Sequence, residues 1–304
     1  MIPLVAIALL IPSFSQAAQP PVSLGTTSNF AVLAGSTITN TGPTTIGGTA
    51  GGDVGLAPGT AFTGSASVTM SGVQHLADTV AVDAKTALVA AYDDAAGRTP
   101  VTSVATELGG TTLTPGVYGN PTLGITGTLT LDAQGDPNAV FIFQTASTLI
   151  TASSSSVNMI NGAQACNVYW QVGSSATFGT STSFIGHVFA LTSITANTGA
   201  TFRGQLLARN GAVTLDTNTI TNDACAAVVP SATPSASASA SASASESASP
   251  SASASESASP TPVETTETGG ELPNTETPWN LIGLVGAAIL LIGSLIWVFR
   301  KPRA

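Results

Sequence analysis

The feature that most constrains this chain is a repeat of about 18 residues between Asn167 and Thr221. Three consecutive copies span residues 168–185, 186–203 and 204–221, and they place apolar residues at equivalent positions. These columns are Trp170, Val188 and Leu206; Val172, Ala190 and Ala208; and Phe184, Phe202 and Ile220. Apolar columns at a short fixed period are typical of a parallel β-solenoid, because each rung covers the apolar side of the next. The repeat therefore predicts stacked rungs with one face of every strand directed inward.

A second set of columns alternates with the apolar set and is rich in threonine. Its members are Thr177 and Thr180, Thr195 and Thr198, and Thr214 and Thr217, followed by Ser183, Thr201 and Thr219. In the last copy Val213, rather than Ala212, matches Ile194, so we predict a small β-bulge there. A single threonine needs no explanation beyond its preference for strands. A regular column is harder to attribute to that preference alone.

Several runs resemble the microbial ice-binding protein family, and together they cover about residues 22–226. They are NGAQACNVYWQVGSSAT (161–177), ALTSITANTGA (190–200) and LLARNGAVTLDTNTI (206–220), with LGTTSNFAVLAG (24–35), GGDVG (51–55), LTPGVY (113–118) and LDAQGDPNAVFIFQ (131–144) before them. The resemblance implies a mainly β fold. It would be a right-handed β-solenoid of triangular section with one long α-helix packed alongside.

The resemblance also implies an ice crystal surface as the partner. Some members of the family carry T-A/G-x-T/N on the ice-binding face, and the run Thr195-Ala196-Asn197-Thr198 fits this pattern. The equivalent runs 177–180 and 214–217 keep only the end threonines, with Phe178 and Leu215 in second place. The expected ice-binding residues are Thr177, Thr180, Thr195, Thr198, Thr201, Thr214, Thr217 and Thr219.

After the first strand-rich stretch, the apolar period changes to that of a helix. The stripe runs through Val73, Leu76, Ala77, Val80, Ala84, Ala87, Leu88, Ala91 and Ala95. Ser71 and Gln74 match a capping box and Gly97 is a stop signal, which predicts a helix over about residues 72–96. We expect this helix to brace the rungs by docking on Phe189 and Leu207.

Two cysteines, Cys166 and Cys225, bracket the repeat. In an exported protein this arrangement predicts a disulfide. The two histidines offer too few ligands for a metal site, since His75 is expected in the first turn of the helix and His187 at a rung corner. We expect no metal and no cofactor.

The charge of the chain argues against nucleic-acid binding and catalysis. Its net charge is -9, and three of its seven basic residues, Arg300, Lys301 and Arg303, lie near the end. No basic patch is therefore available to neutralise phosphates. The aspartates of the repeat region are scattered among turns, whereas the polysaccharide-cleaving enzymes built on solenoids need clustered carboxylates or a poised base. The sequence predicts a monomer that is not an enzyme.

The ends of the chain predict export and attachment. Residues 1–17 resemble a signal peptide, with a retained N-terminal anchor as the alternative. Residues 230–270 are Ser/Ala/Pro-rich and are predicted to be a disordered stalk. The apolar run 279–299 can span a membrane, and residues 300–304 form a basic cytoplasmic tail.

A short motif precedes the apolar run and resembles a Gram-positive sortase signal. It is Leu272-Pro273-Asn274-Thr275-Glu276 (272–276), and Glu276 stands where the sortase pattern has glycine. This tail allows two alternative forms of attachment. The protein is either linked to the cell wall after cleavage at Thr275, or held by a plain membrane anchor. Either attachment would place the domain outside the cell.

The sequence therefore predicts a secreted, surface-anchored ice-binding protein that is attached to the cell wall or membrane through its C-terminus. The alternative is a non-enzymatic surface adhesin or structural wall-layer protein on the same scaffold, because a fold does not determine a function.

Overall fold

The computed structural model describes residues 18–227. The predicted signal peptide (1–17), stalk (230–270), sorting motif (272–276), membrane span (279–299) and basic tail (300–304) lie outside the described residues. Across residues 18–227, no helix is long and apolar enough to cross a membrane.

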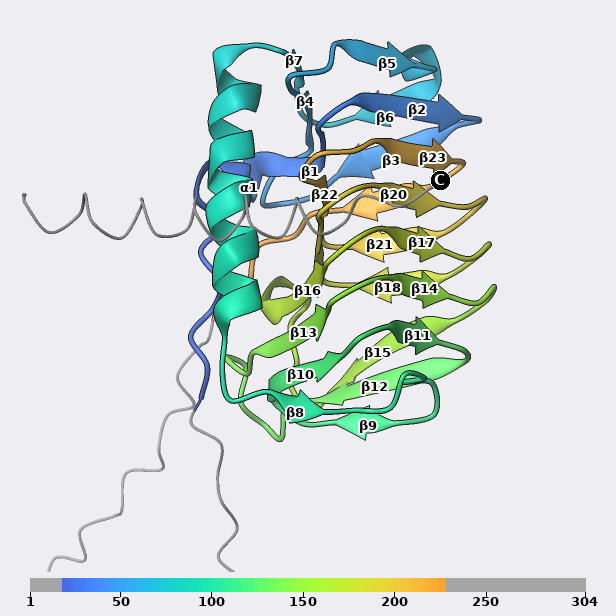
Figure 1. Cartoon of the computed structure of the whole chain (residues 1–304). Coiled ribbons are helices and arrows are strands. Elements are labelled where there is room, and N and C mark those ends of the chain that lie inside the picture. The colour runs from blue at the N-terminus through green and yellow to red at the C-terminus, as the bar shows by residue number, and fades with distance from the viewer. Residues whose placement is uncertain (1–17, 228–304) are drawn as a thin grey trace, which may run out of the picture. The chain divides into compact units, whose positions relative to one another are not determined.

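Three sheets of parallel strands form the faces of a solenoid, and one α-helix runs alongside them (Figure 1). In spatial order, sheet A contains β7 (Gln74–Leu76), β4 (Asp53–Leu56), β1 (Phe30–Ala34), β22 (Leu206–Ala208), β19 (His187–Ala190), β16 (Val168–Val172), β13 (Phe141–Thr145), β10 (Gly116–Asn120) and β8 (Thr102–Ser103). Sheet B contains β11 (Leu123–Ile125), β14 (Leu149–Thr151), β17 (Ala176–Phe178), β20 (Ile194–Ala196), β23 (Val213–Asp216), β2 (Thr37–Thr41) and β5 (Ala61–Thr63). Sheet C contains β6 (Val68–Met70), β3 (Thr44–Gly47), β24 (Thr219–Thr221), β21 (Thr201–Arg203), β18 (Ser183–Ile185), β15 (Ser156–Ile160), β12 (Thr128–Asp132) and β9 (Thr112–Leu113).

A complete rung takes one strand from every sheet, in the order A, B, C, and short turns form the corners. The rungs at the two ends are incomplete, because the helix follows β7 and an isolated bridge between Glu107 and Gly124 stands in place of a sheet B strand between β8 and β9. Three 3₁₀ turns lie in the connections: η1 (Gly25–Asn29), η2 (Ser65–Ser67) and η3 (Ala165–Asn167). This arrangement confirms the predicted mainly β solenoid with one helix.

The apolar columns predicted from the repeat are confirmed. Trp170 pairs with Val188, which pairs with Leu206, and all three side chains are fully buried. The column of Phe184, Phe202 and Ile220 is in register in the same way. Alternation along each strand directs these side chains inward, where stacking on the next rung removes them from water.

Aromatic rings continue this packing along the inside of sheet A. Tyr118, Phe143 and Trp170 occupy one register position on successive strands, and the Phe143 and Trp170 ring centroids lie 3.9 Å apart at an interplanar angle of 10°. The indole Nε1 of Trp170 donates to the Ile185 carbonyl at 2.9 Å. The largest side chain of the core therefore has its polar atom satisfied.

The order of the rungs differs from the order of the chain. The first rung stacks on the last, because β1, β2 and β3 pair with β22, β23 and β24. In Figure 1 the N-terminal strands lie directly beside the orange C-terminal ones. The chain then adds β4 to β7 beyond the first rung, returns through the helix to the far end, and builds the remaining rungs toward the first.

The helix α1 (Thr79–Gly97) begins later than the predicted residue 72, although it ends near the predicted stop. The proposed capping box at Ser71 and Gln74 is wrong. The N-cap is Asp78, whose carboxylate accepts a hydrogen bond from the Ala81 amide at 2.8 Å. Gln74 belongs instead to β7, because β4 offers it an open sheet edge with which to pair.

The later start changes which residues face the solenoid. Ala81, Ala84, Leu88, Ala91, Tyr92 and Ala95 are the buried residues of the helix. Val73 and Val80, which the predicted stripe included, are 60% and 46% exposed. The helix docks on Phe189 and Leu207 as predicted, and Tyr169 and Ile142 extend the same apolar cluster.

The predicted bulge in the last repeat is not in the strand. Ile194 pairs with Val213 as expected, and the next two residues of β20 and β23 remain in register. Ala190 pairs with Ala208 on the preceding strands, so the extra residue falls in the turn between β22 and β23. A corner can lengthen without breaking backbone pairing, whereas a bulge would interrupt the pairing.

Substitution of Phe202 by Ala tests the packing of the core. Phe202 is 2% exposed and packs edge-on against Phe178, with ring centroids 5.0 Å apart. We expect Phe202→Ala to lower the free energy of unfolding by about 3 to 5 kcal/mol, because it leaves a cavity between rungs. Denaturant unfolding measures the change. The neighbouring exposed Thr201→Ala is the control and should stay within about 0.5 kcal/mol; equal losses in the two variants would contradict the inward assignment of Phe202.

Candidate binding surface

The helix covers the outward face of sheet A. Its residues Leu88 and Tyr92 lie in one apolar cluster with outward side chains of sheet A, including Tyr169 and Phe189. Tyr92 also accepts a hydrogen bond from the Gln171 amide at 2.7 Å. In the described part of the chain, regular rows of outward side chains therefore reach solvent from sheets B and C.

Sheet B carries a ladder of five threonines on consecutive strands. Thr177, Thr195, Thr214, Thr39 and Thr63 are in register along β17, β20, β23, β2 and β5. Parallel pairing repeats each side chain at the strand spacing of about 4.8 Å. Beyond Thr177 the same position is occupied by Ile150 and then by Gly124.

Buried neighbours hold the ladder in position. Ile194 and Ala196 flank Thr195 and are fully buried, and Val213 and Leu215 flank Thr214 in the same way. Because alternate residues of a strand point to opposite faces, the threonine between them is directed outward. Burial of these neighbours and the backbone pairing together fix the direction of Thr195 and Thr214 on sheet B.

Thr39 and Thr63 were missed by the sequence analysis. They belong to rungs at the start of the chain, and only the stacking of the first rung on the last brings them into line with Thr214. The alternation of Thr37, Thr39 and Thr41 is the signal that could have located them.

Thr180, Thr198 and Thr217 lie in the turns that follow β17, β20 and β23, so they form an exposed corner beside sheet B. Two of these hydroxyls donate hydrogen bonds to the Asp216 carboxylate. The Thr198 hydroxyl donates to its carboxylate, and the Thr217 hydroxyl donates to the other carboxylate oxygen at 3.0 Å. The structure thus separates the two threonines of Thr195-Ala196-Asn197-Thr198, which lie on the sheet and at its corner.

Thr201 and Thr219 lie on sheet C, in a separate ladder of hydroxyl side chains. Its register runs through Thr128, Ser156, Ser183, Thr201, Thr219, Thr45 and Thr69. The strands of this sheet also carry Arg203 and Asp132, whereas Asp216 is the one charged residue in the strands of sheet B. The predicted threonines therefore divide between two faces and one corner.

The disulfide between Cys166 and Cys225 is confirmed, with a Cα–Cα distance of 5.4 Å. A hollow of about 590 Å³ beside it is lined by Met159, Gln164, Arg203 and Asp223, among others. The lining contains no pair of carboxylates and no activated nucleophile, so it offers no arrangement for hydrolysis.

His75 lies in β7, and the prediction that it occupies the first turn of the helix is wrong. Its Nδ1 contacts the Asp78 carboxylate at 2.7 Å. Asp78 caps the helix, and Asp53, 3.9 Å from Nε2, accepts a hydrogen bond from the Val73 amide. Both carboxylates thus have structural roles, and residues 18–227 contain no group of three or more His, Cys, Asp or Glu side chains suited to a metal ion.

His187 is fully buried and stacks on Tyr169, with ring centroids 5.3 Å apart. Burial lowers the pKa of His187 to about 4, although the Cys166 backbone and the Gln205 amide oppose the shift. Neither of these groups reaches hydrogen-bonding geometry with the ring, whose two nitrogens lack partners among the described residues. The folded protein therefore holds this imidazole neutral.

Comparison with known proteins identifies the family of this solenoid. The family model described as Ice-binding-like matches residues 32–221. The chain belongs to this ice-binding family. The alternative of an adhesin or wall-layer protein finds no support in these comparisons.

Individual relatives agree with the family model. An ice-binding protein of Nostoc sp. (strain HG1) is 49% identical over 216 residues, which cover 68% of this chain and 78% of that protein. The crystal structure of an ice-binding protein from an Antarctic biological consortium has 47% identity and a TM-score of 0.66, covering 69% of this chain and 95% of that one. The crystal structure of the ice-binding protein of Antarctomyces psychrotrophicus has 40% identity and a TM-score of 0.62, and the match covers 66% of this chain and 98% of that one.

The buried histidine predicts that stability depends on pH. The unfolded chain protonates His187 near pH 6.5, but the folded chain does so only near pH 4. The unfolded state therefore binds more protons in this interval, and the free energy of unfolding should fall as pH drops. Between pH 7 and 4.5 we expect a loss of about 2 to 3 kcal/mol.

Denaturant unfolding at the two pH values measures this loss. His187→Gln does not titrate in the interval, so its stability should change much less with pH. The same pH dependence in both proteins would contradict the assignment to His187.

Proposed function

We propose that this protein binds ice and that sheet B is the contact surface. The observation that carries the proposal is the ladder of Thr177, Thr195, Thr214, Thr39 and Thr63, which spans five consecutive rungs on an open face. Membership of the ice-binding family supports the same partner.

A fixed row of threonines suits a surface made of ordered water. Each hydroxyl can hydrogen-bond a water molecule, and each methyl group limits the orientations that the water can adopt. Holding a water in place costs up to about 2 kcal/mol of entropy. On a rigid array much of this ordering precedes contact with the crystal, so the waters can join the ice lattice with little further loss.

Sheet B suits this role better than its neighbours do. Sheet A is covered by the helix, and the strands of sheet C carry Arg203 and Asp132. Charged side chains bind disordered water strongly and resist its replacement by a lattice. On sheet B, Asp216 lies at the end of β23, where it holds the hydroxyls of Thr198 and Thr217.

The eight threonines expected from the sequence are assigned as follows. Thr177, Thr195 and Thr214 form the centre of the proposed face, and the turn residues Thr180, Thr198 and Thr217 form its edge. Thr201 and Thr219 are the alternative face on sheet C.

We further propose that the protein is secreted as a monomer and held at the cell surface by its C-terminal segment. The Cys166–Cys225 disulfide supports export, because such bonds persist in oxidising compartments. The motif Leu272 to Glu276, the apolar run 279–299 and the basic end support attachment.

Substitution of Thr195 by Tyr tests the proposed face. Thr195 lies on the second of the five rungs, between Thr177 and Thr214, so a large side chain there should interrupt the flat row. We expect Thr195→Tyr to remove most inhibition of ice recrystallisation and to change the free energy of unfolding by no more than about 0.5 kcal/mol. Thr39→Tyr should have the same effect, since it belongs to the same ladder.

Thr201→Tyr on sheet C is the matched control and should leave ice activity intact. Full activity of Thr195→Tyr together with loss in Thr201→Tyr would place the contact on sheet C. Wild-type protein that neither shapes ice nor slows its recrystallisation would refute ice binding itself.

The C-terminal peptide of surface-extracted protein tests the attachment. If sortase cleaves the motif, mass spectrometry should find mature protein that ends at Thr275 and is joined to wall material. Recovery of peptides that include Arg303 would show a membrane anchor instead. Intact full-length protein found only in the medium would contradict both forms of attachment.

A further inference from the structure

The disulfide lies at the one corner of the solenoid that sheet B does not touch. Because each rung runs through sheets A, B and C in turn, the passage from C to the next A is the corner opposite sheet B. Cys166 lies in η3 directly before β16, and Cys225 follows β24. The last described residues therefore leave the domain behind the proposed contact face.

Residues 222–226, here called the strap, run along this corner and join distant parts of the fold. At its beginning the side-chain Nδ2 of Asn222 donates to the Ser28 carbonyl at 2.8 Å. The Asp223 carboxylate then accepts from the Thr49 amide at 3.2 Å, and the Ala224 amide donates to the Thr49 hydroxyl at 3.1 Å. The first half of the strap is thus bound to the N-terminal rungs.

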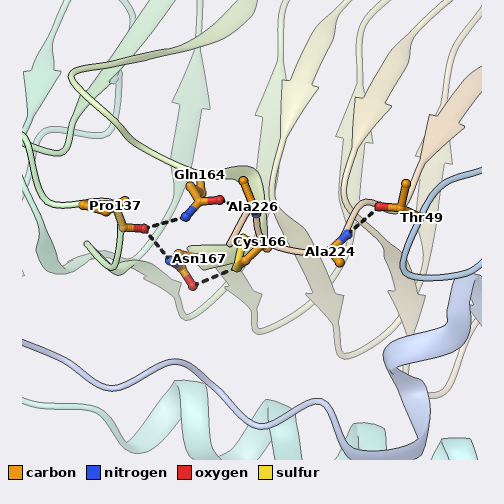
Figure 2. Close-up of a disulfide and its surroundings, with 8 residues drawn as sticks. Thr49, Pro137, Gln164, Cys166, Asn167, Ala224 and Ala226 are labelled. Carbon is orange, nitrogen blue, oxygen red and sulfur yellow. Dashed lines mark hydrogen bonds between the residues drawn. A yellow bond between two sulfur atoms is a disulfide. The ribbon is translucent and has the colours of Figure 1, made fainter. Parts of the chain in front are cut away.

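The second half of the strap is bound to the middle of the solenoid, as Figure 2 shows. Cys225 is bonded to Cys166, and the Ala226 amide donates to the Gln164 side chain at 2.7 Å. Gln164 in turn donates to the Pro137 carbonyl at 2.8 Å. The chain beyond residue 227 therefore continues from a point that is covalently attached next to β16.

The disulfide closes residues 166–225 into a covalent loop with a sequence separation of 59. This loop contains strands β16 to β24, and with them all eight threonines expected from the repeat. Thr177, Thr195 and Thr214 are the three of these on sheet B. The loop thus encloses the centre of the proposed face.

We infer that the Cys166–Cys225 disulfide makes the strap a force-bearing attachment, which protects this face when the C-terminal chain is pulled. The inference rests on the proposed function, in which the face holds ice while the C-terminus holds the cell. Tension from the tail enters the domain at Cys225 and divides between its two sides. One side is β24, and the other, through Cys166, is β16.

The division of load matters because the two strands are held differently. β24 has three residues and pairs with β21 and β3. β16 has five buried residues, pairs with β13 and β19 along its length, and contacts the helix. With the disulfide, tension cannot peel β24 away and then loosen the rungs one at a time, because both arms of the loop must yield together.

A single-molecule pulling experiment on the full chain tests the inference without ice. One handle is attached to the side chain at position 195 and the other to the C-terminus, and the force of the first rupture is measured. We expect Cys166→Ser/Cys225→Ser to rupture at lower force than the disulfide-bonded protein. Thr49→Ala, which removes strap hydrogen bonds but keeps the disulfide, is the matched control and should retain the wild-type force.

A second geometry covers the case in which the double variant does not fold. A handle placed at position 221, ahead of the strap, pulls β24 directly in protein whose disulfide is intact. Rupture there should occur at lower force than with the C-terminal handle. Equal forces in the two geometries would overturn the inference.

Ice activity of the wild-type protein without handles, measured in free solution, separates this inference from the proposed function. Wild-type protein that lacks ice activity but shows the force difference would refute only the ice-binding proposal. Active protein with equal rupture forces would refute only the force-bearing role of the disulfide.

Discussion

The pairing of the first rung with the last is the contact on which the rest of this structure depends. β1, β2 and β3 each add to a sheet beside β22, β23 and β24, so the last rungs leave no open edge there. Unpaired edges expose backbone groups that invite association with other chains. This pairing also explains the helix, which carries the chain back to the far end, and it extends the threonine ladder to Thr39 and Thr63.

Polar contacts close the seam between the N-terminal rungs and the later ones. The Gln205 amide donates to the carbonyls of Thr27, Ser28 and Phe30, at 2.7, 3.3 and 2.5 Å. Thr27 and Phe30 are buried and Ser28 is half-buried, so each of these carbonyls in and after η1 would be costly to leave without a partner. His187 lies against Gln205, so the seam contains the one buried histidine of the described chain. Protonation of His187 would therefore lower stability at the seam between the N-terminal rungs and the later ones.

The binding proposal and the stability of the fold depend on the same alternation along strands. The outward threonines Thr177, Thr195, Thr214 and Thr39 each lie between two buried neighbours, and the stacked rungs hold those neighbours in place. A substitution such as Phe202→Ala should therefore affect function through the fold, whereas Thr195→Tyr should affect function alone. The disulfide adds a covalent limit on how far the rungs that carry these threonines can separate.

The sequence by itself determined the features that depend on local period and on composition. The columns of Trp170 and Phe202, the docking of the helix on Phe189 and Leu207, and the Cys166–Cys225 bond were all predicted correctly. The tertiary structure alone decided the start of the helix and the membership of the ladder. Gln74 joins β7 because a sheet edge is available to it, and Thr39 aligns with Thr214 because strands from opposite ends of the chain pair. A local sequence pattern predicts neither outcome, because many strands of this chain have the same alternation. Only the packing of the whole domain selects which of these strands become neighbours.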